Sequence, residues 1–326
     1  MKKFIYIFIL TFLTINVAVG GNLVIDANKQ ELDLQNNQIN LEGNVKVKMN
    51  DMTLVGPRAV GKINPKTNKL EEAIFPDSPY AYQKNGNKKS EIKAKIIKAS
   101  LLNKVVKASG DTQSVTMVNN QPVLIINADT QEYDTQIEQM RANGSVIVHY
   151  QDMVAFGDKA IVDVNKKGDV KKMQLIGNAK INQKDNKAYA DRFVYTASNE
   201  EIVSIGNTYS KMIMDNGKQI EVWAQYQQYN KPANTILASN KVTIYYDDYK
   251  AYGPKVTVFP NKVTNKFNKI VFLGRAKIVE KNRSIDADKI IITMEPKNFT
   301  ALGNVKTIIT NIDDLKDIGP APTGKK

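Results

Sequence analysis

The sequence has no cysteine, and it has only one histidine and one tryptophan among 326 residues. Without cysteine the chain forms no disulfide and offers no thiol nucleophile, so stability has to come from core burial and strand pairing. A lipid-modified cysteine anchor is excluded for the same reason. His149 has no cysteine and no second histidine with which to share a zinc ion. We therefore expect no metal site and no cofactor.

Catalytic signatures are missing as well. The chain shows no convincing Ser-His-Asp order, P-loop or dinucleotide fingerprint. Four acidic residues, Asp129, Asp158, Asp191 and Asp288, recur at one position of a repeat, which favours a role in turns or bulges over a catalytic one. We therefore expect no catalytic residue and no enzymatic activity; an enzyme acting on an envelope polymer is the least favoured reading.

Positive charge is in excess, with 46 Lys and Arg against 33 Asp and Glu and a formal net charge of +13. The basic residues are scattered through polar positions and form no run that would indicate a nucleic-acid patch. Nucleic acid is therefore not an expected partner, and lipid phosphates or cell-wall polymers remain as anionic ones.

Residues 1–20 are typical of a secretory signal peptide. Lys2 and Lys3 precede an apolar stretch over 4–19, and the small residues Ala18 and Gly20 suit signal peptidase. This predicts an exported, periplasmic protein. An uncleaved N-terminal anchor is the alternative. At the other end, residues 312–326 contain two prolines and are expected to form a flexible tail.

A short motif recurs along the mature chain: apolar residues, one small residue, and often Asp or Pro. It repeats about every 30 to 40 residues, the spacing of a repeat array. Three copies carry glutamine three places later, at Gln30, Gln131 and Gln227, which indicates a triplicated block of about 97 residues. We expect one continuous array over 21–311, with blocks near 23–123, 124–219 and 220–311. The small residues are Ala27, Gly56, Ala94, Ala128, Gly157, Ala190, Ala224, Gly253 and Ala287.

Within each repeat the apolar positions alternate with a period of two. Around Gly43, for example, Leu41, Val45 and Val47 share one face while Lys46 lies on the other, as in a β-strand with one buried face. An interior glycine points to a bend, and a phase slip beside the small residue points to a β-bulge. The pattern predicts an all-β protein with roughly eighteen bent strands, at two per repeat. Trp223 is expected to pack within it.

A second motif, Gly-Asn followed by an apolar strand, carries a family resemblance. It reads Leu41-Glu42-Gly43-Asn44-Val45 at its first occurrence and Leu175-Ile176-Gly177-Asn178-Ala179 at a later one. Together with the Ala-Asp step of Ala190-Asp191-Arg192-Phe193, it resembles the repeat of the LptA/OstA family of lipopolysaccharide-transport proteins. The resemblance covers nearly all of 23–308, although the chain is nearly twice as long as expected for that family.

The resemblance implies an elongated, twisted and open β-jelly-roll whose inner face accepts acyl chains. It implies a periplasmic bridge that carries lipopolysaccharide, or a similar anionic glycolipid, between the inner and outer membranes. Its partners would be related jelly-roll domains of membrane transport proteins, with head-to-tail self-association. The alternatives are a structural or adhesive repeat protein without ligand, and an inner-membrane-anchored jelly-roll partner of the same pathway. Inward-facing candidates for the lipid trough are Val47, Val148, Tyr150, Ile181, Ile244, Tyr246 and Ile278.

Overall fold

The computed structural model describes residues 23–49, 52–100, 102–134, 136–150, 153–165, 170–213 and 218–310. The expected signal peptide and C-terminal tail lie outside these residues. Within them, no helix has the length and apolar character to cross a membrane. The chain divides into two compact units, Met1–Gly177 and Asn178–Lys326, and each is described by itself.

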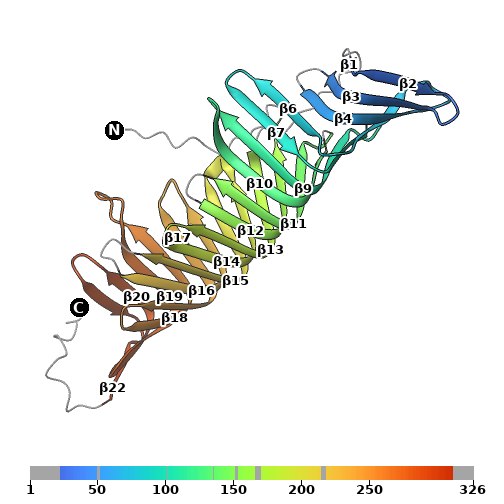
Figure 1. The fold of residues 1–326 in the computed structure, drawn as a ribbon. Helices are drawn as coiled ribbons and strands as arrows, with labels where there is room; N and C mark the ends of the chain where they lie inside the picture. The colour runs from blue at the N-terminus through green and yellow to red at the C-terminus, as the bar shows by residue number, and fades with distance from the viewer. Residues whose placement is uncertain are drawn as a thin grey trace. The chain divides into compact units, whose positions relative to one another are not determined.

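The described residues form antiparallel β-strands, which run side by side within each unit (Figure 1). The first unit contains β1 (Leu23–Asp26), β2 (Lys29–Asp33), β3 (Gln38–Met49), β4 (Met52–Ile63), β5 (Leu70–Phe75), β6 (Tyr80–Asn85), β7 (Lys88–Lys93), β8 (Ile96–Ser100), β9 (Val105–Val118), β10 (Gln121–Asp134), β11 (Gln139–Tyr150) and β12 (Met153–Val164). The strand β13 (Val170–Gln183) carries the chain from the first unit into the second. The second unit continues with β14 (Asn186–Thr196), a 3₁₀ turn η1 (Ala197–Asn199), β15 (Glu201–Ile213), β16 (Gln219–Asn230), β17 (Thr235–Tyr246), β18 (Tyr249–Pro260), β19 (Phe267–Glu280), β20 (Arg283–Thr293), β21 (Asn298–Leu302) and β22 (Lys306–Ile309).

Eight of these 22 strands are the halves of four interrupted long strands. Strand β3 pairs with both β1 and β2, and β4 pairs with both β5 and β6. Strand β9 pairs with both β7 and β8, and β20 with both β21 and β22. Counted as long strands, the described chain therefore holds eighteen. The prediction of an all-β fold built from repeated antiparallel strand pairs is confirmed.

The long strands bend at the glycine of the second motif. Gly144 has φ +79° and the next residue, Ser145, has φ +46°, both in the left-handed region. The pairing register of β11 shifts on either side of this point, between Asn143 and Val146 against β12. A left-handed residue that breaks the ladder in this way forms a β-bulge, which bends the strand. The predicted bends and bulges are therefore present.

The recurring aspartate packs against the glycine bend of the next strand. A Cβ atom built on Gly144 would lie 2.0 Å from Asp129 Oδ2, and one on Gly206 would lie 2.2 Å from Asp191 Oδ2. In the second pair, Asn207 Nδ2 also donates to Asp191 Oδ2 at 3.1 Å. The aspartates thus belong to the bulge, as their spacing predicts, and the glycine is required because no side chain fits there.

The two halves of each bent strand contribute to one core, as in a β-jelly-roll. In the second unit a single apolar cluster joins Ile236 and Ala238, before the bend of β17, to Val242 and Ile244 after it. Phe272 of β19 lies in the same cluster and is fully buried. Burial of apolar side chains on one strand face is the main source of stability in such a fold.

The glutamines that mark the repeat build a buried polar bridge in each unit. Gln131 is 2% exposed and its Nε2 donates to Thr112 Oγ1 at 3.0 Å; Gln227 is 6% exposed and donates in the same way to Thr208 Oγ1 at 2.9 Å. Each threonine hydroxyl donates in turn to a backbone carbonyl at the bulge. Gln30, the third copy, is exposed in β2. The glutamine that recurs in each block therefore takes part in a buried hydrogen-bond network in two of the three blocks.

The two bridges differ in one contact, which gives a stability prediction. Ser210 Oγ donates to Gln227 Oε1 at 2.7 Å, whereas the equivalent Ser114 Oγ and Gln131 Oε1 are buried without a partner. We expect Ser210→Ala to lower the free energy of unfolding by about 1 to 3 kcal/mol, because it leaves a buried carbonyl oxygen unpaired. Ser114→Ala is the matched control and should cost less than about 0.5 kcal/mol. Denaturant titration of both variants checks this, and equal losses would contradict it.

Glu72 of β5 gives a pH-dependent prediction. Its carboxylate lies 2.7 Å from Lys98 Nζ and 3.3 Å from Lys62 Nζ, and its side chain is 19% exposed. The hydrogen bond from Lys98, followed by that from Lys62, lowers the pKa of Glu72. The ionised form is therefore favoured in the folded state. Its contribution is present above the ordinary carboxyl pKa and is lost as pH falls through the lowered folded pKa.

We expect Glu72→Gln to reduce the free energy of unfolding by about 1 kcal/mol at neutral pH. The difference from the unmodified chain should vanish at a pH below the folded pKa of Glu72. Glu42→Gln serves as the control, since Glu42 is 63% exposed and 3.9 Å from Lys29, and exposed pairs contribute little. Unfolding measured at several pH values tests the prediction, and a pH-independent loss would oppose it.

Candidate lipid-binding face

The seven inward candidates all lie on the core side of long strands. Val47 (9% exposed), Val148 (3%), Ile244 (2%) and Ile278 (3%) are buried. Tyr150, Ile181 and Tyr246 are half-buried. We call this group the inner-face set. Tyr150 and Tyr246 are the last residues of β11 and β17, and the other five each lie two residues before the end of their strand.

In the first unit, strand register brings Val47 and Val148 into one row. From Val47 of β3, directly paired residues lead strand by strand to Val148 of β11. The intermediate residues are Leu54, Ala81, Ile92, Ser114 and Ile126, and the row continues beyond Val148 to Ala155 of β12. At ~4.8 Å per strand, these eight strands give an inner row on the order of 30 Å long. All of its members except Ser114 are apolar.

The second unit has a row of the same kind. Ile244 of β17 pairs with Ala251 of β18, which pairs with Ile278 of β19. The row extends to Val222 of β16 on one side and to Ile285 of β20 on the other. Ile244 and Ile278 belong to the apolar cluster of this unit, and Tyr246 packs against its edge.

Tyrosine hydroxyls mark the edge of the inner face. Burial raises the pKa of Tyr150, and burial together with Glu138 and Asp134 raises the pKa of Tyr133 to about 12. These phenols therefore stay neutral across the physiological range. Apart from the buried Gln–Thr bridges, the inner face is hydrocarbon with uncharged tyrosine hydroxyl groups at its edge, which suits the apolar part of an amphiphile.

Much of each row could not be read from the sequence. Alternation within single strands identifies inward positions such as Val148, but the partners Ile126 and Ala155 emerge only from the register. The buried Ser114 and the half-buried Ser210 pair with Ile126 and Val222 of these rows, and they carry no sequence signal that would place them on an apolar face. Pairing register links segments far apart in the chain, and no local pattern encodes it.

The described residues hold no cluster of three or more metal-ligating side chains. His149 is exposed on β11, one residue before Tyr150 and on the opposite strand face.

The fold and the apolar rows define an all-β repeat protein with an apolar inner row in each unit. The sequence matches the family described as LptA/(LptD N-terminal domain) LPS transport protein over residues 24–121 and 125–221. The chain belongs to this family, whose members are transport proteins and not enzymes.

No curated protein matches the chain. Among solved structures it is similar to LptH, the LptA homologous periplasmic component of the conserved lipopolysaccharide transport device from Pseudomonas aeruginosa. The identity is 15% and the TM-score 0.34, over 40% of this chain and 95% of that one.

Proposed function

We propose that this chain is a periplasmic bridge protein that binds lipopolysaccharide, or a similar anionic glycolipid, by its acyl chains on the inner face. The observation that carries the proposal is the family match over two segments in the first two thirds of the chain. The apolar rows through Val148 in the first unit and Ile244 in the second support it, because paired strands extend a hydrocarbon surface across several strands of each unit.

Charge supports an anionic lipid. Removal of Lys2 and Lys3 with the signal peptide takes the formal charge from +13 to +11. Lysines such as Lys46 lie exposed on the outer face of strands whose inner face is apolar. An apolar face backed by excess positive charge matches a ligand that combines acyl chains with phosphates.

The end strands support a partner of the same fold. β1 and β2 pair with β3 at the start of the array, and β21 and β22 pair with β20 at its end. A terminal strand offers backbone N–H and C=O groups to another sheet. We propose that related jelly-roll domains of membrane transport proteins, or a second copy of this chain, add there.

The burial of Val47, Val148, Ile244 and Ile278 favours a second candidate function. A core this closed is also what a structural repeat protein without ligand would have. For acyl chains to enter such a core, the half-buried side chains of Tyr150, Ile181 and Tyr246 would have to move aside first.

Binding of intact and deacylated lipopolysaccharide by the purified mature chain tests the proposal. We expect binding of the intact glycolipid and at least a hundredfold weaker binding of the deacylated form, because each buried CH₂ contributes about 0.8 kcal/mol. Equal affinity for both forms would rule out acyl recognition, and absence of binding would favour the structural alternative.

A further inference from the structure

The outer face of the second unit carries a ladder of aromatic rings. Tyr189, Tyr209 and Trp223 occupy directly paired positions on β14, β15 and β16. Their ring centroids are 5.6 Å and 4.9 Å apart, and Tyr245 of β17 follows at 5.1 Å from Trp223. Cross-strand aromatic pairs stabilise a sheet, so the ladder has a structural role. Its exposure calls for a further explanation.

Rings of the ladder, and Tyr252 beside it, are exposed to solvent. Trp223 is 37% exposed, Tyr245 40% and Tyr252 36%. Trp223 is the only tryptophan in the chain. Clusters of exposed large aromatic side chains on a soluble protein mark binding surfaces.

Trp223 and Tyr245, the last two rings of the ladder, line a groove of about 850 Å³ across β16, β17 and β18. Its charged groups are largely engaged. Lys218 pairs with Asp247, and Lys250 Nζ lies 4.9 Å from the Tyr245 ring centroid and 5.1 Å from that of Tyr252. Flat aromatic rings with polar groups between them suit a ligand that has alternating apolar and hydroxyl-bearing faces, as a sugar ring has.

A smaller, basic hollow of about 430 Å³ adjoins the groove and shares Thr243 and Tyr252 with it. Lys241, Arg275 and Lys277 line it, against a single carboxylate, Asp286. Arg275 also donates to the Asn304 carbonyl oxygen at 2.8 Å and lies 3.6 Å from Asp288 Oδ1, which offsets part of its charge. The hollow therefore provides net positive charge at one end of the aromatic groove.

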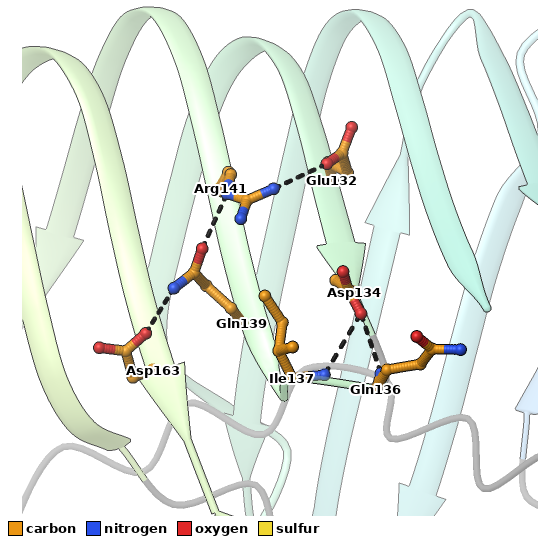
Figure 2. Close-up of polar contacts among 7 residues, drawn as sticks. All are labelled: Glu132, Asp134, Gln136, Ile137, Gln139, Arg141 and Asp163. Carbon is orange, nitrogen blue, oxygen red and sulfur yellow. Dashed lines mark hydrogen bonds and ion pairs between the residues drawn. The ribbon is translucent and has the colours of Figure 1, made fainter. Parts of the chain in front are cut away.

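The outer face of the first unit differs. At the β10, β11 and β12 strand ends, Arg141 Nη1 lies 3.3 Å from Glu132 Oε1, and Arg141 Nε donates to Gln139 Oε1 at 2.8 Å (Figure 2). Gln139 Nε2 donates in turn to Asp163 Oδ1 at 2.8 Å. These polar groups satisfy one another, and no aromatic ring takes part in this network.

We propose that the outer groove of the second unit binds an acidic oligosaccharide, with sugar rings stacked on Trp223 and Tyr245 and an anionic group held by Lys241, Arg275 and Lys277. The groove opens on the outer face at Trp223, Tyr245 and Tyr252, and Tyr246 of the inner-face set borders it at the end of β17. The rings and the adjoining cations fit a glycan that carries carboxylates, of the cell-wall type.

The single tryptophan makes the test direct. A carboxylated wall tetrasaccharide (a muropeptide) is titrated into the purified mature chain while Trp223 fluorescence is recorded. Uncharged chitotetraose and the deacylated saccharide of lipopolysaccharide are titrated in parallel. We expect a saturable change in fluorescence with the muropeptide and at least about tenfold weaker binding of chitotetraose, the effect of one lost charge-assisted contact.

Two variants separate ligand binding from sheet stability. Tyr245→Ser should weaken muropeptide binding about tenfold, the size of one aromatic contact. Tyr80→Ser is the matched control, because Tyr80 is 38% exposed and stacks on Tyr82 at 6.0 Å in the first unit; it should leave binding unchanged. Lys277→Gln should abolish the preference over chitotetraose. Thermal unfolding of each variant shows that the fold persists.

The remaining outcomes overturn the proposal. Absence of a response to the muropeptide at millimolar concentration would leave the ladder with a structural role alone. Equal binding of chitotetraose would remove the acidic requirement. Tighter binding of the lipopolysaccharide saccharide would assign the groove to the transported glycolipid. None of these results depends on whether the inner face binds acyl chains.

Discussion

Gly144→Ala should lower the free energy of unfolding by about 3 to 4 kcal/mol, as the sum of backbone strain and overpacking. Gly144 has φ +79°, which an L-residue adopts only at a cost. A Cβ atom there would lie 2.0 Å from Asp129 Oδ2 and 2.8 Å from Asp129 Cβ. Asp129 is exposed and its carboxyl group can turn away, but its Cβ atom is held by the backbone of β10.

Two further variants test this reason for the glycine. Gly86 has φ +59°, but no atom lies within 4 Å of a Cβ built there. Gly86→Ala should therefore lower the free energy of unfolding by only about 1 kcal/mol. Asp129→Gly in the Gly144→Ala background should recover part of the loss, because it removes the clash and leaves the strain. Denaturant unfolding followed by circular dichroism measures all three. Equal costs at Gly86 and Gly144 would show that the contact with Asp129 is unimportant.

Phe272→Ala should cost about 3 to 5 kcal/mol, the usual range for truncating a buried aromatic side chain. Phe272 is fully buried on β19 in the apolar cluster of the second unit. It pairs with Val256 of β18 and Ile290 of β20, which are 1% and 0% exposed. Close-packed neighbours of this kind cannot collapse fully into the space that the ring leaves.

Fluorescence of Trp223 follows unfolding of this unit in denaturant, since Trp223 lies on β16 of the same unit. Val263→Ala is the control: Val263 is 93% exposed in the turn between β18 and β19, and its truncation should change stability by less than about 0.5 kcal/mol. A loss below about 1.5 kcal/mol for Phe272→Ala would mean that the core adapts far more readily than a close-packed one does.

The repeat predicted the fold class because bends and bulges leave a local signature. A glycine and an aspartate, such as Gly144 and Asp129, recur at the bend and the bulge of the regular copies. The period-two alternation shows which face of each strand is buried. The interrupted strands carry a weaker signal. Between β5 and β6 the chain passes through Pro76 and Pro79, with Asp77 at φ +65° and Ser78 at φ +62°. Proline lacks the N–H that a continuous ladder needs, so the strand separates into two halves.

The candidate faces were predictable to different extents. Alternation identifies Val148 and Ile244 as inward positions, and both are buried. It does not reveal that Tyr189, Tyr209 and Trp223 form one ladder, because that alignment depends on the register of three strands. The amino-acid composition of an apolar row is the same whether the row packs against protein or binds acyl chains. The sequence alone therefore does not distinguish a closed core from a lipid-binding face.

Photocrosslinking in cells at Tyr150 and Tyr246 tests the central claim most directly. Both are half-buried on the inner face, so a photoreactive phenylalanine fits with little disturbance. The control is His149, which precedes Tyr150 and is exposed on the opposite strand face. The account predicts crosslinks to lipopolysaccharide from Tyr150 and Tyr246 and none from His149. Normal expression without crosslinks from the two inner positions, or equal crosslinks from His149, would contradict it.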